Sequence, residues 1–294
     1  VTSRNFLNEM LFLSCEAYPS KKELSKACQN LYALTLRYQT RRLGSYLDSS
    51  YMMRVLEDRY TEKDNFKKSL ELLSSLLFHP NLDNKAFKEE EFNTVYQEMK
   101  ADLETIKENK HLYATMRLFE SMDSDYVSIN GLGYLSDLDK ITKETLYDYH
   151  QNMLLHNIVD IFVLGNVDEE EIVPLIQEIF PFSTFKARRK SVFTKTEPRN
   201  KEKIVLESYP AKQSQLAISC TLSNLSTYER NYPFTLYSTI LGSGSNSYLF
   251  QEVREKASLA YTISCSCNKF DDLLIIEGGI TKGKEKEALK IITK

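Results

Sequence analysis

A short basic segment divides this chain into two stretches that follow the same plan. Eight of the eighteen residues from 186 to 203 are Lys or Arg, and apolar periodicity is nearly absent there. On both sides of it, helical apolar runs alternate with paired runs typical of antiparallel strands. A chain of 294 residues is also close to the size at which single cores stop growing. We therefore predict two domains of similar architecture joined by a linker.

The predicted fold class is α+β, with each domain built from a mostly antiparallel sheet and helices packed on one face. Residues 1–185 form the first domain, 186–203 the basic linker and 204–294 the second domain. A solvated tether explains the charge of the linker more simply than an anionic docking surface. Because the chain starts at Val1 beside a helix and stops within a helical pattern, both domains are expected to be truncated.

Local signals place the elements. Ser20, with Glu23 three residues later, has the capping-box pattern of a helix start, and Thr142 caps another helix. Alternating runs around Gly44 predict an antiparallel pair, and residues 158–165 predict a buried strand. The further predicted helices cover residues 2–14, 64–79, 85–109, a segment through 118, 168–180, 228–241 and a short one before 260; the further strands cover 204–209, 215–222, 260–268 and 273–280.

Composition excludes several classes of protein. A net charge of −3 with 27% charged residues leaves no basic surface that calls for nucleic acid. The longest apolar run, Ile158–Val167, is too short to cross a membrane, and no signal peptide is visible. An odd number of cysteines, five, indicates a reducing compartment, so we expect a cytoplasmic protein. Cys265 and Cys267 should share one strand face; buried thiols are expected there rather than a metal or redox pair.

The residues that usually carry catalysis do not form a complete set. The four histidines, His79, His111, His150 and His156, lack the i+3 or i+4 spacing that puts two metal ligands on one helix face. The nucleophile elbow G-x-S-x-G, the phosphate loop and G-x-G-x-x-G are absent. The acidic run at Glu89–Glu91 is expected to be a solvated helix face.

The order of motifs resembles that of a known family. The stretch "LGSGSNSYLFQEVREKASLAY" (residues 241–261) is similar to the C-terminal domain of the insulinase/pitrilysin superfamily, which includes the mitochondrial processing peptidase. "NVDEEEIVPLIQEIFPF" resembles the helix that closes the family's N-terminal domain, and "FHPNLDNKAFKEEEFNTVYQEM" the segment with its third zinc ligand. The resemblance covers nearly the whole chain and implies the two-domain fold.

The same resemblance implies that the zinc motif is lost. Active members bind zinc through an inverted H-x-x-E-H helix and a later glutamate, and the motif glutamate is the general base. Alignment of "LNEMLF" with the family's "LEHMLF" puts Asn5 and Glu9 at the histidines and Asn8 at the base. Glu91 matches the third ligand. We expect no metal in this chain, because amide and carboxylate replace the imidazoles that zinc prefers.

Two residues match a substrate-contact pair of the family. Arg254 and Tyr261 have the residue types and seven-residue spacing of an arginine and a tyrosine that the metal-free half presents to zinc-bound substrate. Gly242 and Gly244, in the preceding turn, are expected to make that turn flexible. The structural alternative is a salt-bridging arginine at a helix end and a strand tyrosine. The resemblance favours a heterodimer in which zinc lies in a homologous subunit and the substrate is an unfolded peptide.

Two other functions remain open. The chain could be a non-enzymatic scaffold or peptide-binding protein of the same fold. Alternatively, it could be a peptidase with unusual ligands, for example Glu9, Glu91 and a histidine outside this sequence.

Overall fold

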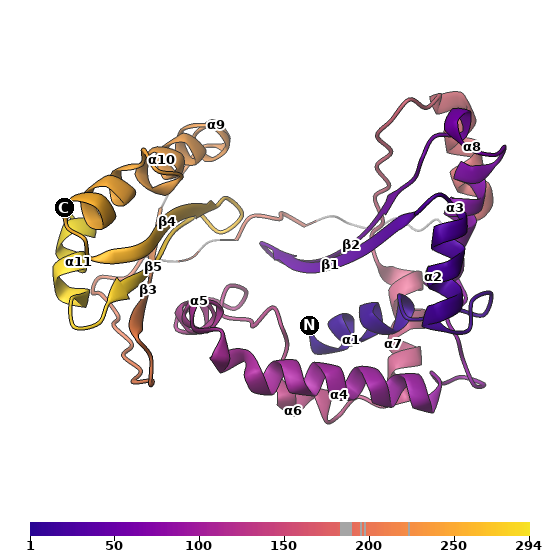
Figure 1. Ribbon diagram of the computed structural model, residues 1–294, viewed down its shortest axis with the longest axis horizontal. Coiled ribbons are helices and arrows are strands. Elements are labelled where there is room, and N and C mark those ends of the chain that lie inside the picture. Colours follow the sequence, from indigo (N-terminus) through magenta and orange to yellow (C-terminus); the bar gives the residue numbers. More distant parts are fainter. Residues whose placement is uncertain (183–189, 195, 197, 223) are drawn as a thin grey trace. The chain divides into compact units, whose positions relative to one another are not determined.

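The computed structural model describes residues 1–182, 190–194, 196, 198–222 and 224–294. It contains two compact units, coloured along the sequence in Figure 1. The first unit comprises Val1–Arg41, Leu47–Leu103 and Gly131–Lys190; the second comprises Arg42–Tyr46, Glu104–Asn130 and Ser191–Lys294. This grouping differs from the boundaries expected from the sequence, because two segments from before residue 186 pack with the second unit.

The first unit is a hairpin with helices around it. Strands β1 (Thr35–Leu43) and β2 (Tyr46–Arg54) pair through a turn at Gly44, whose φ of 55° suits glycine. The capping predictions are confirmed: Ser20 accepts from the Glu23 amide, and Thr142 forms a capping box with Thr145. The helices are α1 (Thr2–Leu11), α2 (Lys21–Asn30), η1 (Asp58–Tyr60), α3 (Asn65–Phe78), α4 (Glu89–Thr105), α6 (Leu135–Leu138), α7 (Lys143–His156) and α8 (Glu169–Ile179).

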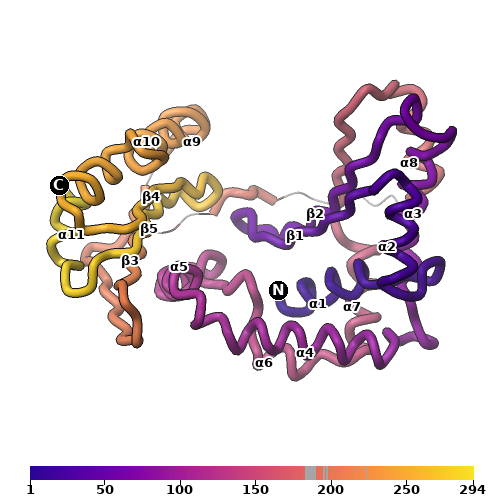
Figure 2. The backbone as a smooth tube through the Cα atoms, in the orientation of Figure 1, coloured from indigo at the N-terminus to yellow at the C-terminus, as the bar shows by residue number. Residues whose placement is uncertain are grey.

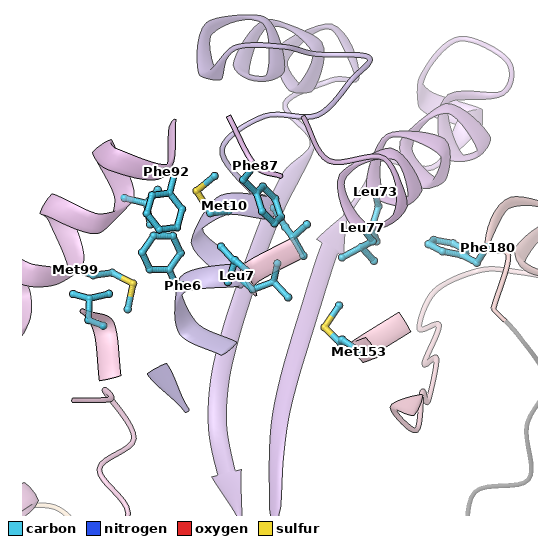
Figure 3. Packing of buried hydrophobic residues seen from close by; sticks show 14 of the residues in the cluster. Phe6, Leu7, Met10, Leu73, Leu77, Phe87, Phe92, Met99, Met153 and Phe180 are labelled. Carbon is cyan, nitrogen blue, oxygen red and sulfur yellow. The ribbon is translucent and has the colours of Figure 1, made fainter. Parts of the chain in front are cut away.

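The core of the first unit is built around α1. Phe6, Leu7 and Leu11 of this helix are completely buried. Figure 3 shows Phe6 facing Phe92 of α4, with ring centroids 4.7 Å apart. Apolar residues of α3 and α7 complete the cluster. Helix α1 is thus fixed in the centre of the unit, which fixes the side chains on its polar face as well.

The second unit is a three-stranded antiparallel sheet in the order β3-β5-β4, formed by β3 (Gln213–Thr221), β4 (Ala260–Asn268) and β5 (Leu273–Thr281). Its helices are η2 (Ile106–Glu108), α5 (Lys110–Glu120), α9 (Thr227–Asn231), α10 (Pro233–Gly242), the π-helix η3 (Phe250–Lys256) and α11 (Glu285–Ile292). The single helix predicted over 228–241 is two helices, because Pro233 cannot donate the hydrogen bond that would continue α9.

Alternate residues of β5 face two different layers. Leu274, Ile276 and Ile280 join a core with residues of α10, η3 and α11. Leu273 and Ile275 point the other way and pack with Val127 and with side chains of α5 and the turn after it. The expected α+β class is confirmed, and α5 adds a partial second layer.

Two predicted strands are wrong. Residues 158–165 and 204–209 have no strand partner in the described structure. Their apolar side chains are exposed: Phe162 is 92%, Leu164 103% and Leu206 89% accessible. An apolar β-branched run shows that a segment can form a strand, but a strand also needs a neighbour to bond its backbone.

Among the described helices, none has both the length and the apolar character needed to span a bilayer.

Candidate functional site: the altered metal helix and the Arg254–Tyr261 segment

Asn8, which the sequence alignment matched to the family's general base, is held in a hydrogen-bond network. Its side chain is completely buried. Nδ2 donates to Thr40 Oγ1 at 2.7 Å and to Ser49 Oγ at 3.1 Å. Tyr51 donates its hydroxyl hydrogen to Asn8 Oδ1 at 2.6 Å. An amide is suited to this place because it donates and accepts at once, whereas an ionised carboxylate only accepts.

None of the described residues that bond the Asn8 side chain, Thr40, Ser49 and Tyr51, is a base at neutral pH. Burial is the main cause that raises the pKa of Tyr51 to about 12, so its phenol stays protonated. Thr40 and Ser49 are hydroxyls that have no base beside them in this network. This network can therefore tie α1 to both strands of the hairpin, but it cannot take a proton from a water molecule.

The two positions that match the family's histidines have different partners. Asn5 donates from Nδ2 to the carbonyl oxygens of Gly131 and Leu132, at 3.0 and 3.1 Å. Glu9 is exposed and accepts a hydrogen bond from Tyr38. The pKa of Tyr38 is raised by burial first, and then by this bond and by the charges of Glu9 and Glu98.

Glu91 and Glu98, both on α4, have different surroundings. Glu91 accepts from Ser14 Oγ at 2.6 Å and from Asn81 Nδ2 at 3.3 Å. Glu98 lies two turns further along α4, and its charge acts on Tyr38 together with that of Glu9. Seven residues separate Glu91 and Glu98, so both carboxylates lie on one face of α4.

The residues present do not fit a zinc site. No group of three His, Cys, Asp or Glu side chains in the described residues could hold a metal ion. The buried histidine, His150, is far from α1 in the sequence and donates from Nε2 to the Leu77 carbonyl at 2.8 Å. Burial lowers the pKa of His150, so its ring is neutral and structural.

Arg254, on η3, is free of buried ion pairs. Its guanidinium carbon lies 4.5 Å from the centroid of the Phe250 ring. Nε is 3.7 Å from the carboxylate of Glu255, and 40% of the arginine side chain is accessible. Exposed pairs at such distances contribute little to stability. The π-helical turn matters because such turns re-aim side chains and are frequent at functional sites.

Tyr261 lies at a β-bulge. In the ladder with β5, Ala260 pairs with Ile280 and Thr262 with Gly279, so Tyr261 is the extra residue. Its side chain is 69% exposed. Between η3 and the bulge, Ser258 has a φ of 53°, rare for a residue with a side chain. A π-turn, a left-handed serine and a bulge thus occur in one segment, and motif spacing alone did not reveal them.

The two glycines of the expected flexible turn have separate roles. Gly242 is the buried last residue of α10, and a Cβ there would lie 2.3 Å from the Cβ and amide nitrogen of Cys265. Gly244 has a φ of 82° and open space around it. Gly244 therefore belongs to a turn, whereas Gly242 permits close packing of α10 on β4.

Comparisons with known proteins show the family and the fold of the chain. A model of the "Peptidase M16 inactive domain" family matches residues 140–294. The "Probable inactive metalloprotease YmfF" of Bacillus subtilis is 26% identical, over 99% of this chain and 69% of the relative. A crystal structure of a conserved protein from Enterococcus faecalis has a TM-score of 0.86 at 28% identity, and covers 99% of this chain and 69% of its own. A protease from Helicobacter pylori shares the fold, with a TM-score of 0.73 at 16% identity, 99% of this chain and 68% of that one.

Proposed function

Because the chain belongs to the M16 peptidase inactive-domain family, we propose that it is the metal-free half of a two-subunit zinc peptidase. A homologous subunit with an intact H-x-x-E-H helix would bind zinc and hydrolyse the peptide. This chain would form part of the chamber wall and present Arg254 and Tyr261 to the substrate. The proposed compartment is the cytoplasm, from the odd cysteine count of the sequence.

The observation that carries the proposal is the contrast between the two halves of the chain. At the altered metal helix, Asn8 is buried and fully engaged by Thr40, Ser49 and Tyr51. In the second unit, Arg254 and Tyr261 remain accessible. The buried, bonded amide of Asn8 cannot activate a water molecule, while two groups that can bind a polar substrate face solvent.

Arg254 and Tyr261 suit the chemistry proposed for them. A guanidinium has several N–H donors in a fixed plane and can hold peptide carbonyl oxygens. A protonated phenol can donate to the oxyanion that forms when water attacks a carbonyl beside zinc. Neither role requires a proton transfer by this chain, which fits the absence of a base around Asn8.

The test is reconstitution with a zinc-bearing homologue that carries an intact H-x-x-E-H helix. Each purified chain should be inactive or nearly so, and the mixture should hydrolyse a quenched fluorescent peptide. In the complex, Tyr261→Phe should lower kcat by about 100-fold, the cost of one oxyanion donor. Arg254→Ala should lower kcat/KM by at least about tenfold, whereas Lys256→Ala, an exposed change on the same helix, should not.

A mixture that forms a stable complex without peptidase activity would support the second candidate, a scaffold or peptide-binding protein. In the first unit, the exposed apolar side chains of Phe162 and Leu164 favour this alternative, because exposed apolar groups can bind polypeptide without any metal. Unchanged rates for Arg254→Ala and Tyr261→Phe in an active complex would show that neither side chain contacts the substrate during catalysis.

A further inference from the structure

Phe250 and Arg254 lie four residues apart on the π-helix η3, so their side chains share one face of the helix. Figure 2 traces this segment of the chain between α10 and β4. The guanidinium carbon of Arg254 lies over the Phe250 ring, 4.5 Å from its centroid, which is within the range of a cation–π contact. Because both residues belong to one short helix, the contact needs no residue from elsewhere in the chain.

The Phe250 ring is not part of the core of the second unit. Its neighbours Leu249 and Val253 are completely buried in that core. Phe250 itself is only partly buried and, among the described residues, is not one of the side chains that pack against the core. Core packing therefore does not explain an aromatic residue at this position, whereas the contact with Arg254 does.

The acidic residues of η3 leave the N–H groups of Arg254 available. Glu252 accepts a hydrogen bond from Lys256 Nζ at 2.6 Å. The Glu255 carboxylate lies 3.7 Å from Arg254 Nε, which is beyond hydrogen-bond distance. A ring that contacts a guanidinium by its flat face uses none of its N–H donors, whereas a carboxylate bound to its edge uses two. The ring can thus hold Arg254 while the edge of the guanidinium stays open to a ligand.

We propose that Phe250 is a positioning residue for Arg254, and that the stacked guanidinium presents its N–H edge to a backbone carbonyl of the peptide. The inference rests on the proposed function, in which Arg254 contacts the substrate. A long side chain loses rotamer freedom when it binds, and a contact that holds it in place beforehand lowers this cost. Phe250 acts only through Arg254, without touching the substrate.

The first measurement uses the 294-residue chain alone. In a nitrogen–proton correlation spectrum of the arginine Nε–Hε groups, the signal that Arg254→Ala removes belongs to Arg254. Phe250→Leu should move this signal downfield, because a proton above an aromatic ring is shielded by it. Phe250→Tyr keeps the ring and should leave the signal nearly in place. Tyr248→Leu is the matched control: it removes another exposed ring, two residues earlier, and should not move the signal.

The second measurement uses the two-chain complex. Phe250→Leu should lower kcat/KM about threefold, the factor that a cation–π contact at an exposed site supplies. Phe250→Tyr should retain the parent value. In the Arg254→Ala background, Phe250→Leu should cause no further decrease, because a positioning residue has no effect once the group that it positions is gone. Circular dichroism of each variant checks that the fold is retained.

An Arg254 signal that Phe250→Leu leaves in place overturns the proposal, with or without an active partner. Decreases in kcat/KM that add up in the double variant also overturn it, because Phe250 would then act independently of Arg254. The spectra need no partner, so the two claims fail separately. A moved signal with an inert two-chain mixture supports the positioning of Arg254 and refutes the proposed function alone, whereas an active mixture with an unmoved signal refutes this inference alone.

Discussion

The hydroxyl of Tyr51 donates to the side-chain oxygen of Asn8 over 2.6 Å, inside the first unit. The same amide donates to Thr40 and Ser49, so β1 and β2 are both bonded to one residue of α1. Asn8 thus joins helix α1 to both strands of the hairpin.

Replacement of Asn8 by alanine should destabilise the protein by about 2–3 kcal/mol, because Tyr51 would be left buried without its acceptor. Asn5→Ala is the control, since that amide is only partly buried and bonds two loop carbonyls; it should cost less than about 1 kcal/mol. Urea unfolding followed by circular dichroism measures both. Equal decreases in the free energy of unfolding would show that the Asn8 network contributes no more to stability than the bonds of Asn5.

Alanine substitutions of two arginines in the second unit, Arg42 and Arg254, should also differ in their effect on the free energy of unfolding. Arg42 bonds both carboxylate oxygens of fully buried Asp271, at 2.8 and 2.5 Å. Arg42→Ala leaves that charge without its main partner and should cost about 3–5 kcal/mol. Arg254→Ala should change the free energy of unfolding by less than about 1 kcal/mol. A large loss for Arg254→Ala would favour a structural role for Arg254.

The sequence predicted most local structure because its signals were local. Ser20 and Thr142 marked helix starts, Gly44 marked the hairpin, and β4 was predicted with its observed limits. The runs 158–165 and 204–209 were predicted wrongly because pairing depends on a neighbour, which periodicity cannot reveal.

The candidate site was only partly predictable. The residue types at Asn5, Asn8 and Glu9 indicated a lost metal motif. They did not indicate that the Asn8 side chain would form hydrogen bonds with Thr40, Ser49 and Tyr51. These partners come from strands 32 to 43 residues away in sequence, and contacts of that kind leave no spacing pattern. The bulge at Tyr261 was equally hidden, because it depends on register with β5.

Stability should fall in mild acid because of His150. Burial lowers the pKa of His150 in the folded protein. Just below pH 6.5, His150 is therefore protonated in the unfolded chain but still neutral in the folded protein. The free energy of unfolding should therefore decrease as pH falls from 6.5 to 5, by up to about 1.4 kcal/mol per pH unit. In His150→Gln this slope should weaken. If both proteins show the same slope in urea titrations, His150 is not the group responsible.

The two glycines near residue 243 give a further contrast. Gly242→Ala puts a methyl group 2.3 Å from Cys265 and forces α10 away from β4, at a cost of about 1–3 kcal/mol. In Gly244→Ala the added methyl group contacts no other atom, but alanine is strained in the left-handed conformation of this residue. This strain should lower the free energy of unfolding by about 1–2 kcal/mol. Gly242→Ala should also expose Cys265, whose pKa burial raises to about 12, to alkylation. Alkylation of Cys265 that is as slow in Gly242→Ala as in the parent chain would contradict this packing.

The central claim is that this chain holds no catalytic metal of its own. It is tested most directly by the zinc content of the pure protein, measured by mass spectrometry after incubation with excess zinc and gel filtration. The account predicts far less than one equivalent per chain, together with no hydrolysis of peptides by the chain alone. One tightly bound equivalent, accompanied by peptide hydrolysis that a chelator abolishes, would contradict it.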